Sequence, residues 1–249
     1  MKEKWFVVGD VHGEFDLLEK LLKHWDEETE DLVFLGDLAD RGPKSKDCLL
    51  TVMDLVASGR AKCLKGNHED MLQNWLEDPE QRFLNYLRNG GKETIDDLLY
   101  EGASETLSPV ELAQAICQTY PDLVSFLESL PYYSENDFCI AVHAGINLDL
   151  PDWRQTSDRD FVWMREEFYN HPARPEKLVV FGHTPVQYLH SNAGDTQLWY
   201  QNNRLNIDGG AAYQGALHGV VLSSQGIEAD YQLFHPQYQW QENLDQDTF

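Results

Sequence analysis

The sequence predicts an α/β fold, and two observations lead to that prediction. Apolar runs of strand length alternate with helical patterns in the N-terminal part of the chain, which is typical of βαβ units with right-handed crossovers. In addition, the apolar runs end at polar clusters, each with a glycine nearby. In open α/β sheets, ligands bind outside the carboxyl ends of the strands, and glycine there permits tight turns.

Five apolar runs are predicted to be strands: residues 5–8, 32–35, 61–64, 138–142 and 178–181. The first three are separated by EFDLLEKLLKH and KSKDCLLTVMDLVASG. In these two segments apolar residues recur every three or four positions, as on one face of a helix. The N-terminal part therefore resembles consecutive βαβ units.

A helical insertion is predicted over about residues 70–135, because this region lacks a strand pattern. Within it, Ser108, Pro109 and Glu111 form a capping-box pattern that predicts a helix running toward Tyr120. The last third of the chain is rich in strand patterns, with a hairpin predicted around residues 223–226. Because the sequence contains no repeat and no low-complexity linker, we predict a single domain over residues 1–249.

Charge and composition restrict the classes of function. The chain has 249 residues and a net charge of −24, which argues against nucleic-acid binding, since that requires a basic surface. No apolar run reaches membrane-spanning length, and the N-terminal run is too short for a signal peptide, so we expect a cytoplasmic protein without membrane contact. The four cysteines are widely spaced, without a CxxC pair. An anionic substrate would require a locally cationic site.

The polar clusters at the five strand ends contain potential metal ligands. They are two carboxylates, three imidazoles and one carboxamide: Asp10, Asp37, His12, His143, His183 and Asn67. Taken alone, Asp10 and His12 would be better explained as a helix cap and an incidental histidine, but five such clusters favour one common site. Ligands of these types suit Mn²⁺, Fe or Zn²⁺ better than Ca²⁺. Six ligands exceed the needs of one tetrahedral ion, so a pair of ions with a shared carboxylate is the simplest interpretation.

The motifs GDVHG, GDLADRG, GNHE, HAG and GHT, in this order, resemble those of the calcineurin-like metallophosphoesterases. The similarity is to the phosphoprotein phosphatase branch, of bacterial type, which is related to the diadenosine tetraphosphatases. It extends from Gly9 to about Asp208. The resemblance implies a four-layer α/β/β/α sandwich with a dinuclear metal centre, and the segment at 70–135 would be an insertion in it.

The resemblance assigns a role to each of the six potential ligands. Asp10 and His12 would bind the first metal, and Asp37 would bridge the two ions. The second metal would be completed by three residues from later clusters: Asn67, His143 and His183.

The same resemblance implies an acid pair and a phosphate-binding set. His68 would protonate the leaving oxygen, and Asp40 would orient His68. Arg41 of the DRG element, Asn67 and Arg165 would contact the phosphate, and the two guanidinium groups would offer bidentate donors.

Three residues keep more than one interpretation. Arg165 precedes Glu166 and Glu167, so a surface ion pair on a helix is an alternative to phosphate binding. Asp208 lies where the family also places a polar strand-end residue, and it receives no role. His218 is interpreted as structural, although its place in the β-rich region leaves a role at the site open.

We therefore expect a metal-dependent phosphatase acting on phosphate monoesters, above all on phosphoserine and phosphothreonine in proteins. Two divalent ions, Mn²⁺ or else Fe or Zn²⁺, would hold a bridging hydroxide that attacks phosphorus in line. The expected partner is a phosphoprotein or a small phosphorylated substrate. One alternative is a hydrolase of dinucleoside polyphosphates such as diadenosine tetraphosphate, with a nucleotide pocket shaped by the helical insertion. The other is a non-catalytic binding module.

Overall fold

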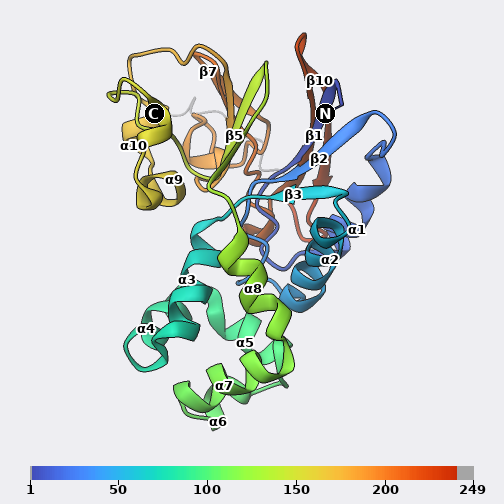
Figure 1. The fold of residues 1–249 in the computed structure, drawn as a ribbon. Helices are drawn as coiled ribbons and strands as arrows, with labels where there is room; N and C mark the ends of the chain where they lie inside the picture. The colour runs from blue at the N-terminus through green and yellow to red at the C-terminus, as the bar shows by residue number, and fades with distance from the viewer. Residues whose placement is uncertain (1, 240–249) are drawn as a thin grey trace, which may run out of the picture.

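The computed structural model describes residues 2–239 and contains two β-sheets that face each other. Figure 1 shows the sheets side by side, with α1 and α2 beside the first sheet and α9 and α10 beside the second. A group of helices, α3 to α8, lies together at one end of the sheets (Figure 1). None of the helices in residues 2–239 has the length and apolar character needed to cross a bilayer.

The first sheet has the strand order β10-β9-β1-β2-β3. Its strands are β1 (Lys4–Val8), β2 (Glu30–Phe34), β3 (Ala61–Cys63), β9 (Ala216–Ser223) and β10 (Gly226–Phe234). The first three are parallel, whereas β9 pairs antiparallel with both β1 and β10. The predicted parallel strands and the predicted C-terminal hairpin are therefore both present.

The second sheet has the order β4-β5-β6-β8-β7. Its strands are β4 (Tyr133–Glu135), β5 (Cys139–Val142), β6 (Leu178–Phe181), β7 (Trp199–Gln201) and β8 (Arg204–Asn206). The three central strands are parallel, and the two edge strands are antiparallel to their neighbours. The carboxyl ends of β5 and β6 consequently lie at one edge of this sheet.

The helices fall into three groups. Beside the first sheet are α1 (Phe15–Leu21), η1 (Leu22–His24) and α2 (Ser45–Ala57). Beside the second are η3 (Trp153–Gln155), α9 (Asp158–Trp163) and α10 (Glu166–Tyr169). Two short turns, η4 (Val186–Tyr188) and η5 (Ala211–Tyr213), precede β7 and β9 respectively. The helical region contains α3 (Asn67–Glu77), α4 (Pro79–Tyr86), the π-turn η2 (Leu87–Gly91), α5 (Lys92–Leu98), α6 (Ala103–Thr106), α7 (Pro109–Thr119) and α8 (Pro121–Ser129).

The alternation of side chains along the strands creates separate cores. In β1, Trp5 and Val7 face the other sheet and pack with residues such as Val180 and Leu205, whereas Phe6 and Val8 face the helices. A third cluster lies between the second sheet and the helices beside it. Helices thus cover the outer faces of two packed sheets, which confirms the predicted four-layer sandwich.

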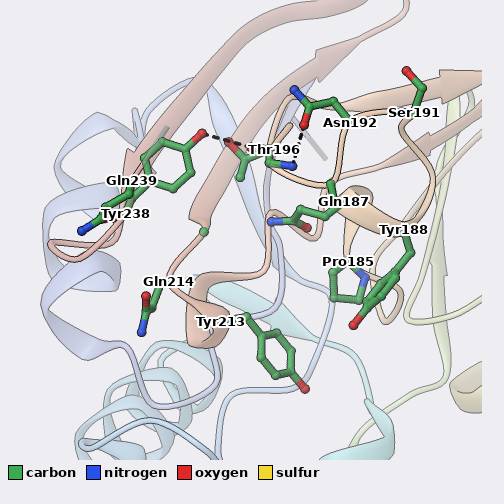
Figure 2. Close-up of a pocket in the computed structure, with 13 residues that line it drawn as sticks. Pro185, Gln187, Tyr188, Ser191, Asn192, Thr196, Tyr213, Gln214, Tyr238 and Gln239 are labelled. Carbon is green, nitrogen blue, oxygen red and sulfur yellow. Dashed lines mark hydrogen bonds between the residues drawn. The ribbon is translucent and has the colours of Figure 1, made fainter. Parts of the chain in front are cut away.

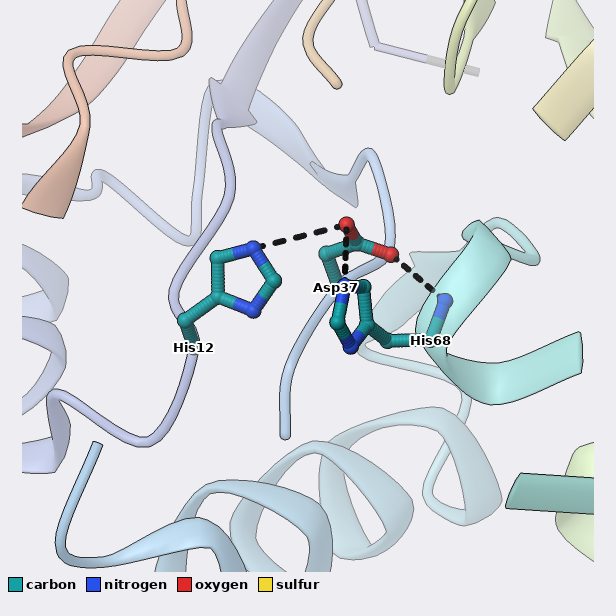
Figure 3. A group of neighbouring side chains, drawn as sticks. All are labelled: His12, Asp37 and His68. Atoms are coloured by element: carbon teal, nitrogen blue, oxygen red, sulfur yellow. Dashed lines mark hydrogen bonds and ion pairs between the residues drawn. The ribbon is translucent and has the colours of Figure 1, made fainter. Parts of the chain in front are cut away.

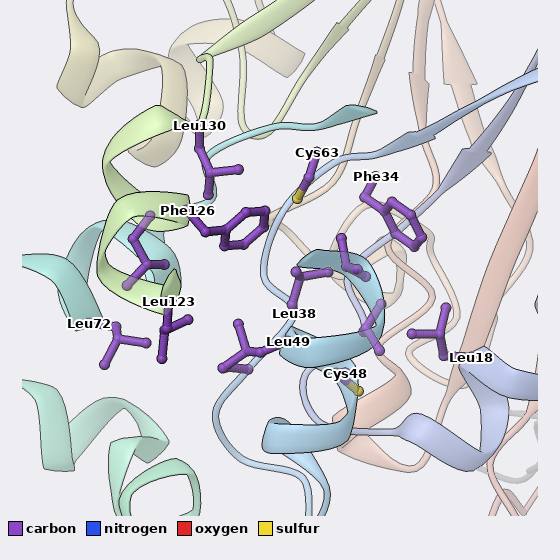
Figure 4. Close-up of a cluster of buried hydrophobic side chains, with 14 of the residues drawn as sticks. Leu18, Phe34, Leu38, Cys48, Leu49, Cys63, Leu72, Leu123, Phe126 and Leu130 are labelled. Atoms are coloured by element: carbon purple, nitrogen blue, oxygen red, sulfur yellow. The ribbon is translucent and has the colours of Figure 1, made fainter. Parts of the chain in front are cut away.

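Figure 4 shows the core on the helical side of the first sheet. Phe34 of β2 and Cys63 of β3 contribute to it, together with Leu49 of α2 and Phe126 of α8. The helical region is therefore packed on the sheet by the same apolar cluster that anchors α2, rather than attached only through its ends.

The predicted limits of the helical region require one correction. Helices extend from Asn67 to Ser129, and the predicted capping box at Ser108 is present at the start of α7. However, Tyr133–Glu135 forms strand β4, which pairs with β5, so the insertion does not extend to residue 135. Three residues of mixed polarity are too few to produce a recognisable strand pattern.

Candidate active site

The potential metal ligands follow five strands whose carboxyl ends converge between the two sheets. Asp10 and His12 follow β1, Asp37 follows β2, and Asn67 begins α3 directly after β3. His143 and His183 follow β5 and β6 of the facing sheet. All six side chains are buried. Parallel pairing within each sheet and packing between the sheets bring together residues separated by as many as 173 positions, as the bond between His183 and Asp10 shows.

Asp37 lies at the centre of this convergence. Its Oδ2 is 3.5 Å from Nε2 of His12, 3.5 Å from Nε2 of His143 and 3.9 Å from Nε2 of His68. Figure 3 shows His12 and His68 both directed at this carboxylate, while Oδ1 accepts the backbone N–H of His68 at 3.0 Å. One carboxylate oxygen therefore faces three imidazoles at once.

Two groups of three side chains could each hold an ion, and both contain Asp37. One consists of His12, Asp37 and His68, and the other of Asp37, His143 and His183; in each, the ligand atoms lie within 4.8 Å of one another. Asn67 belongs to the second group by contact, because its Oδ1 lies 3.0 Å from Nε2 of His143 and 2.8 Å from Nδ1 of His183. The bridging position expected for Asp37 agrees with this arrangement.

Backbone carbonyls orient two of the imidazoles. Nδ1 of His12 lies 2.9 Å from the carbonyl oxygen of Ala39, and Nδ1 of His143 lies 3.0 Å from that of Leu35. These contacts turn the Nε2 atoms of both rings toward Asp37. A hydrogen bond to the far nitrogen of this kind is the usual support of a metal-binding histidine.

Asp10 lies at the edge of the site and belongs to neither three-residue group. Its Oδ2 accepts the backbone N–H of His183 at 3.0 Å, and its Oδ1 is buried without a partner in the described chain. Gly182 makes this approach possible, because a Cβ at that position would collide with Oδ1 of Asp10. Burial and the neighbouring carboxylates of Asp208 and Asp37 raise the pKa of Asp10 well above its ordinary value.

The chemistry of these side chains fits divalent cations. Within the described residues, Oδ1 of Asp10 and Nε2 of His68 and His183 are buried without hydrogen-bond partners, which is costly unless a ligand satisfies them. Burial lowers the pKa of His12, His143 and His183, so each is neutral at neutral pH and has a lone pair to donate. The site therefore has the burial, donor types and unmet polar atoms of a metal centre.

Asp40 and His68 form a buried pair beside these ligands. Nδ1 of His68 lies 2.6 Å from Oδ2 of Asp40, which leaves Nε2 directed toward Asp37. Burial acts to lower the pKa of His68, but the charges of Asp37 and Asp40 and the hydrogen bond to Asp40 outweigh it, so the pKa is raised. A histidine with a raised pKa carries a proton that it can donate, as expected for the acid of the site.

Two residues of the helical region hold the other oxygen of Asp40. Oδ1 accepts the hydroxyl of Tyr86 at 2.7 Å and that of Thr94 at 2.6 Å, and the backbone N–H of Asp40 donates to Oγ1 of Thr94 at 2.8 Å. Both side chains are buried. The orientation of Asp40, and through it that of His68, thus depends on α4 and α5.

The two arginines line an open cleft above the ligands. This cleft has a volume of about 530 Å³, and Arg41, Arg165, His183 and Asp208 are among its lining residues. Arg165 donates to Oγ1 of Thr184 at 2.8 Å, and it forms no ion pair with Glu166 or Glu167 in the described structure. Two carboxylates, those of Glu166 and Asp208, also line the cleft. The cleft therefore presents two guanidinium groups to an anionic substrate within an acidic protein.

Arg41 contacts the site in two directions. Its guanidinium lies over the ring of Tyr213, with 5.2 Å between Cζ and the ring centroid, and its Nη1 contacts Nε2 of His12. Because that nitrogen is a proposed metal ligand, an ion bound by His12 would require the guanidinium of Arg41 to move. We therefore expect the guanidinium of Arg41 to lie elsewhere in the cleft when an ion is bound.

Comparison with known proteins decides the family. The profile described as calcineurin-like phosphoesterase matches residues 4–210, which is most of the chain. The chain belongs to the calcineurin-like metallophosphoesterases. This confirms the resemblance carried by the five motifs, and the convergent strand ends are the place where those motifs lie.

The relatives of this metallophosphoesterase differ in substrate. The chain is 28% identical to an asymmetrical bis(5'-nucleosyl)-tetraphosphatase PrpE from Anoxybacillus flavithermus, over 85% of this chain and 87% of that protein. It is 29% identical to serine/threonine-protein phosphatase 1 from Salmonella typhimurium, over 73% of this chain and 79% of that protein. A solved structure of a putative diadenosine tetraphosphatase superposes with a TM-score of 0.64 at 19% identity, covering 94% and 95% of the two chains. At 19% identity, the similarity to this solved structure shows a shared fold and nothing about the substrate.

Backbone strain is concentrated at the site of this metallophosphoesterase. Eight non-glycine residues of the described chain have positive φ, and five of them are predicted site residues: His12, Asp37, Asp40, Arg41 and His183. Left-handed backbone is unfavourable for side chains other than glycine, and it persists where the surrounding structure imposes it. These turns direct the side chains inward immediately after the strands.

Sequence patterns missed several residues that support the site. Glu69 accepts the backbone N–H groups of Asp37, Leu38 and Gly66 at 2.7, 2.8 and 2.9 Å, and its place in GNHE was a signal for such a role. Tyr86 and Thr94 lie in no motif, and only the fold shows their contact with Asp40. These residues act by holding the loops that carry the ligands.

The structure also places the two residues that were left open. Asp208 is buried and lines the cleft, and burial raises its pKa to about 6. His218 lies away from the ligands: its Nδ1 is 2.8 Å from Oδ1 of Asp230, and its Nε2 is 2.8 Å from the carbonyl oxygen of Thr196. His218 therefore links the loop before β7 to the first sheet.

Proposed function

We propose that this metallophosphoesterase is a metal-dependent hydrolase of dinucleoside polyphosphates, and that six side chains hold two divalent ions, manganese in the first place. The ligands in this proposal are Asp10, His12, Asp37, Asn67, His143 and His183. The observation that carries it is the convergence of buried imidazoles on Asp37 beneath a cleft lined by two arginines. Bound ions would supply Lewis acidity at the phosphoryl group and a water nucleophile of lowered pKa.

The residues of the chain have separate tasks in this proposal. Arg41 and Arg165 bind the non-bridging oxygens of the phosphoryl group, since both line the cleft and a guanidinium offers paired donors. Asn67 lies between His143 and His183 and helps to position the phosphoryl oxygens. His68 donates the proton of its Nε2 to the departing oxygen, and Asp40 keeps its ring in place through Nδ1.

The relatives support a dinucleoside polyphosphate as the substrate. Several proteins named bis(5'-nucleosyl)-tetraphosphatase match the chain nearly end to end, at 26–28% identity over 85–86% of its length in three of them. The chain covers a comparable share of each relative, so the whole domain takes part in the similarity. We therefore place a dinucleoside polyphosphate before a phosphoprotein as the substrate, whereas the sequence alone placed the phosphoprotein first.

Phosphoserine or phosphothreonine in a protein is the second candidate. It is supported by the similarity to serine/threonine-protein phosphatase 1, which covers 73% of this chain. An open cleft at the surface also admits a phosphorylated side chain on a larger partner. Cytoplasmic location, which both candidates share, remains part of the proposal.

Parallel kinetics on three substrates test the proposal. With Mn²⁺ supplied, we expect kcat/KM for diadenosine tetraphosphate to exceed that for a phosphoserine peptide, with p-nitrophenyl phosphate as a common reference. Asp37→Asn should lose turnover of all three, because it removes the charge that both ligand groups share. Turnover of the phosphopeptide together with no turnover of the dinucleotide would replace the first candidate by the second.

A further inference from the structure

A second hollow adjoins the catalytic cleft. It has a volume of about 790 Å³ and is formed by the chain after β6, the turn η5 and the segment after β10 (Figure 2). Pro185, Tyr188 and Tyr213 line both this hollow and the 530 Å³ cleft, so the two adjoin at these residues. We call the second hollow the side pocket. Its size is that of a site for a small organic ligand.

The side pocket differs from the cleft in charge. Although 25% of the residues of the chain are charged, none of the residues that line the side pocket in the described structure is. Neutral amides and hydroxyl groups provide its polar atoms, for example those of Gln187, Asn192 and Gln214. The cleft beside it contains Arg41 and Arg165. Charged groups, with two guanidiniums among them, therefore line the cleft, whereas the adjoining side pocket is lined by neutral groups alone.

Two exposed tyrosines stand where the side pocket and the cleft meet. Tyr188 is 79% exposed and Tyr213 is 59% exposed, so both rings present much of their aromatic surface to solvent. Figure 2 shows both rings at the same end of the pocket, with Pro185 between them in this view. The ring of Tyr213 also receives the guanidinium of Arg41. Exposed aromatic faces of this kind stack on planar heterocycles.

The walls of the side pocket are fixed by contacts to the sheets. Nε2 of Gln232 donates to Oγ1 of Thr196 at 2.8 Å, and Nε2 of His218 lies 2.8 Å from the carbonyl oxygen of the same threonine. Nε2 of Gln187 donates to the carbonyl oxygen of Gly209 at 2.8 Å, whereas its Oε1 is buried without a partner among the described residues. The pocket is thus formed in advance and retains an unmet acceptor in its wall.

We propose that the side pocket binds a nucleoside of the substrate, with the base stacked on Tyr188 and the phosphates in the cleft. A nucleotide matches the side pocket and the adjoining cleft because it joins a neutral, planar, hydrogen-bonding group to a chain of negative charges. The pocket lies on the C-terminal segments, so the helical insertion, from which the sequence suggested a nucleotide pocket, does not form it. The inference rests on the proposed function for the identity of the substrate.

Matched inhibitors test the side pocket without requiring turnover of a dinucleotide. Adenosine 5'-diphosphate and pyrophosphate share a diphosphate, but only the first has a nucleoside. Their inhibition constants would be measured against p-nitrophenyl phosphate hydrolysis at a fixed excess of Mn²⁺. In the native chain we expect the nucleotide to bind about tenfold more tightly than pyrophosphate, the effect of one stacked base.

Three variants connect that preference to the pocket. Tyr188→Ala should abolish the preference, and Tyr188→Phe should keep it, because stacking requires the ring and not the hydroxyl. Tyr200→Ala serves as the control, since Tyr200 is 56% exposed on β7 and lines neither the pocket nor the cleft. Retention of the preference in Tyr188→Phe and its loss in Tyr188→Ala exclude a general loss of folding.

The outcomes separate this inference from the proposed function. A native chain that binds both inhibitors equally, or a preference that survives in Tyr188→Ala, would overturn the nucleoside pocket even if diadenosine tetraphosphate is hydrolysed. Loss of the preference in Tyr188→Ala supports the pocket even if the dinucleotide is not hydrolysed, and it would then point to another nucleotide substrate. Tighter binding of a phosphoserine peptide that depends on Tyr188, without any nucleoside preference, would assign the pocket to peptides instead.

Discussion

His68 combines three features that suit a proton donor. Its ring is buried, its Nδ1 is held by Asp40 at 2.6 Å, and its Nε2 has no partner in the described structure. Its raised pKa results from the nearby negative charges of Asp37 and Asp40, which outweigh burial. Because Nε2 is also within 3.9 Å of Asp37, His68 lies close enough to a proposed ligand to serve the same phosphoryl group.

The substitution His68→Asn tests this role. We expect kcat to fall by roughly 10²–10⁴, the usual contribution of general acid–base catalysis, while the bound metal is retained. The loss should be greatest for an alkyl phosphate, since a nitrophenolate departs without protonation. Steady-state kinetics on both esters, with metal content determined by elemental analysis, would measure it.

The matched control for His68→Asn is His171→Asn, because His171 lies outside the cleft next to Asp149. It should behave as the native chain does. If kcat in His68→Asn were unchanged for the alkyl ester, the assignment of His68 as the acid would be wrong.

Among the individual residues of the site, only some were predictable from the sequence. The proposed ligands and the Asp40–His68 pair were recognisable because each follows a short apolar strand within a motif. Tyr86 and Thr94 were not, since they approach Asp40 from 46 and 54 positions away and lie in no local pattern. The left-handed backbone at Asp37 and Asp40 was also not predictable, because aspartate adopts it more often than most residues but still at a small share of its positions.

The helical region acts on the site as an element. The hydroxyl groups of Tyr86 and Thr94 hold Asp40, and the carbonyl oxygen of Gly90 accepts the backbone N–H of Arg41 at 3.1 Å. A Cβ at Gly90 would come too close to Arg41, so the turn η2 packs directly on the residue that follows Asp40. The Asp40–His68 pair and Arg41 are thus oriented by helices as well as by the strand ends that precede them.

Removal of the hydroxyl group of Tyr86 tests whether the helical region orients Asp40. We expect Tyr86→Phe to lower kcat for an alkyl phosphate about tenfold, the value of a hydrogen bond to a charged group, with little change in KM. The effect on p-nitrophenyl phosphate should be smaller, because protonation of that leaving group matters less. The ratio of the two kcat values is the measurement.

Tyr120→Phe is the control for that ratio. Tyr120 also belongs to the helical region, but its hydroxyl donates to the carbonyl oxygen of Leu98 and does not reach the site. An equal loss on both esters in Tyr86→Phe would mean that the helical region only stabilises the fold, and would contradict its role in orienting Asp40.

The elements themselves were predictable to the extent that they are long or regularly patterned. The parallel strands β1, β2, β3, β5 and β6 and the hairpin of β9 and β10 lie where apolar runs and turn residues predicted them. The edge strands β4 and β7 have three residues each, and their residues are largely polar or partly exposed, so local pattern does not distinguish them from loops. Their positions follow only from pairing with β5 and β8.

For the whole molecule, the net charge of −24 opposes compaction. Monovalent salt screens charges separated by more than about 10 Å at 0.1 M, so it should weaken this repulsion. We therefore expect Tm of the metal-free chain to rise by several degrees between low salt and 0.5 M potassium chloride, as measured by calorimetry. A Tm that falls with salt would show that attractive ion pairs outweigh the net repulsion.

The two sheets meet at one buried cluster of proposed metal ligands. Asp10, His12 and Asp37 come from the first sheet, and His143 and His183 come from the second. Ions held between them would bind the folded chain and not the unfolded one, and so would stabilise the packing of the sheets. Metal dependence of activity and of stability should accordingly occur together.

Hydrolysis of p-nitrophenyl phosphate before and after exhaustive chelation, with stepwise return of Mn²⁺, tests that dependence most directly. We expect the chelated chain to lose activity and to unfold at a lower temperature. Both should return as manganese is added, and activity should reach its plateau at about two equivalents per chain. Activity that survives chelation unchanged, with no metal left in the protein, would contradict the metal-dependent mechanism.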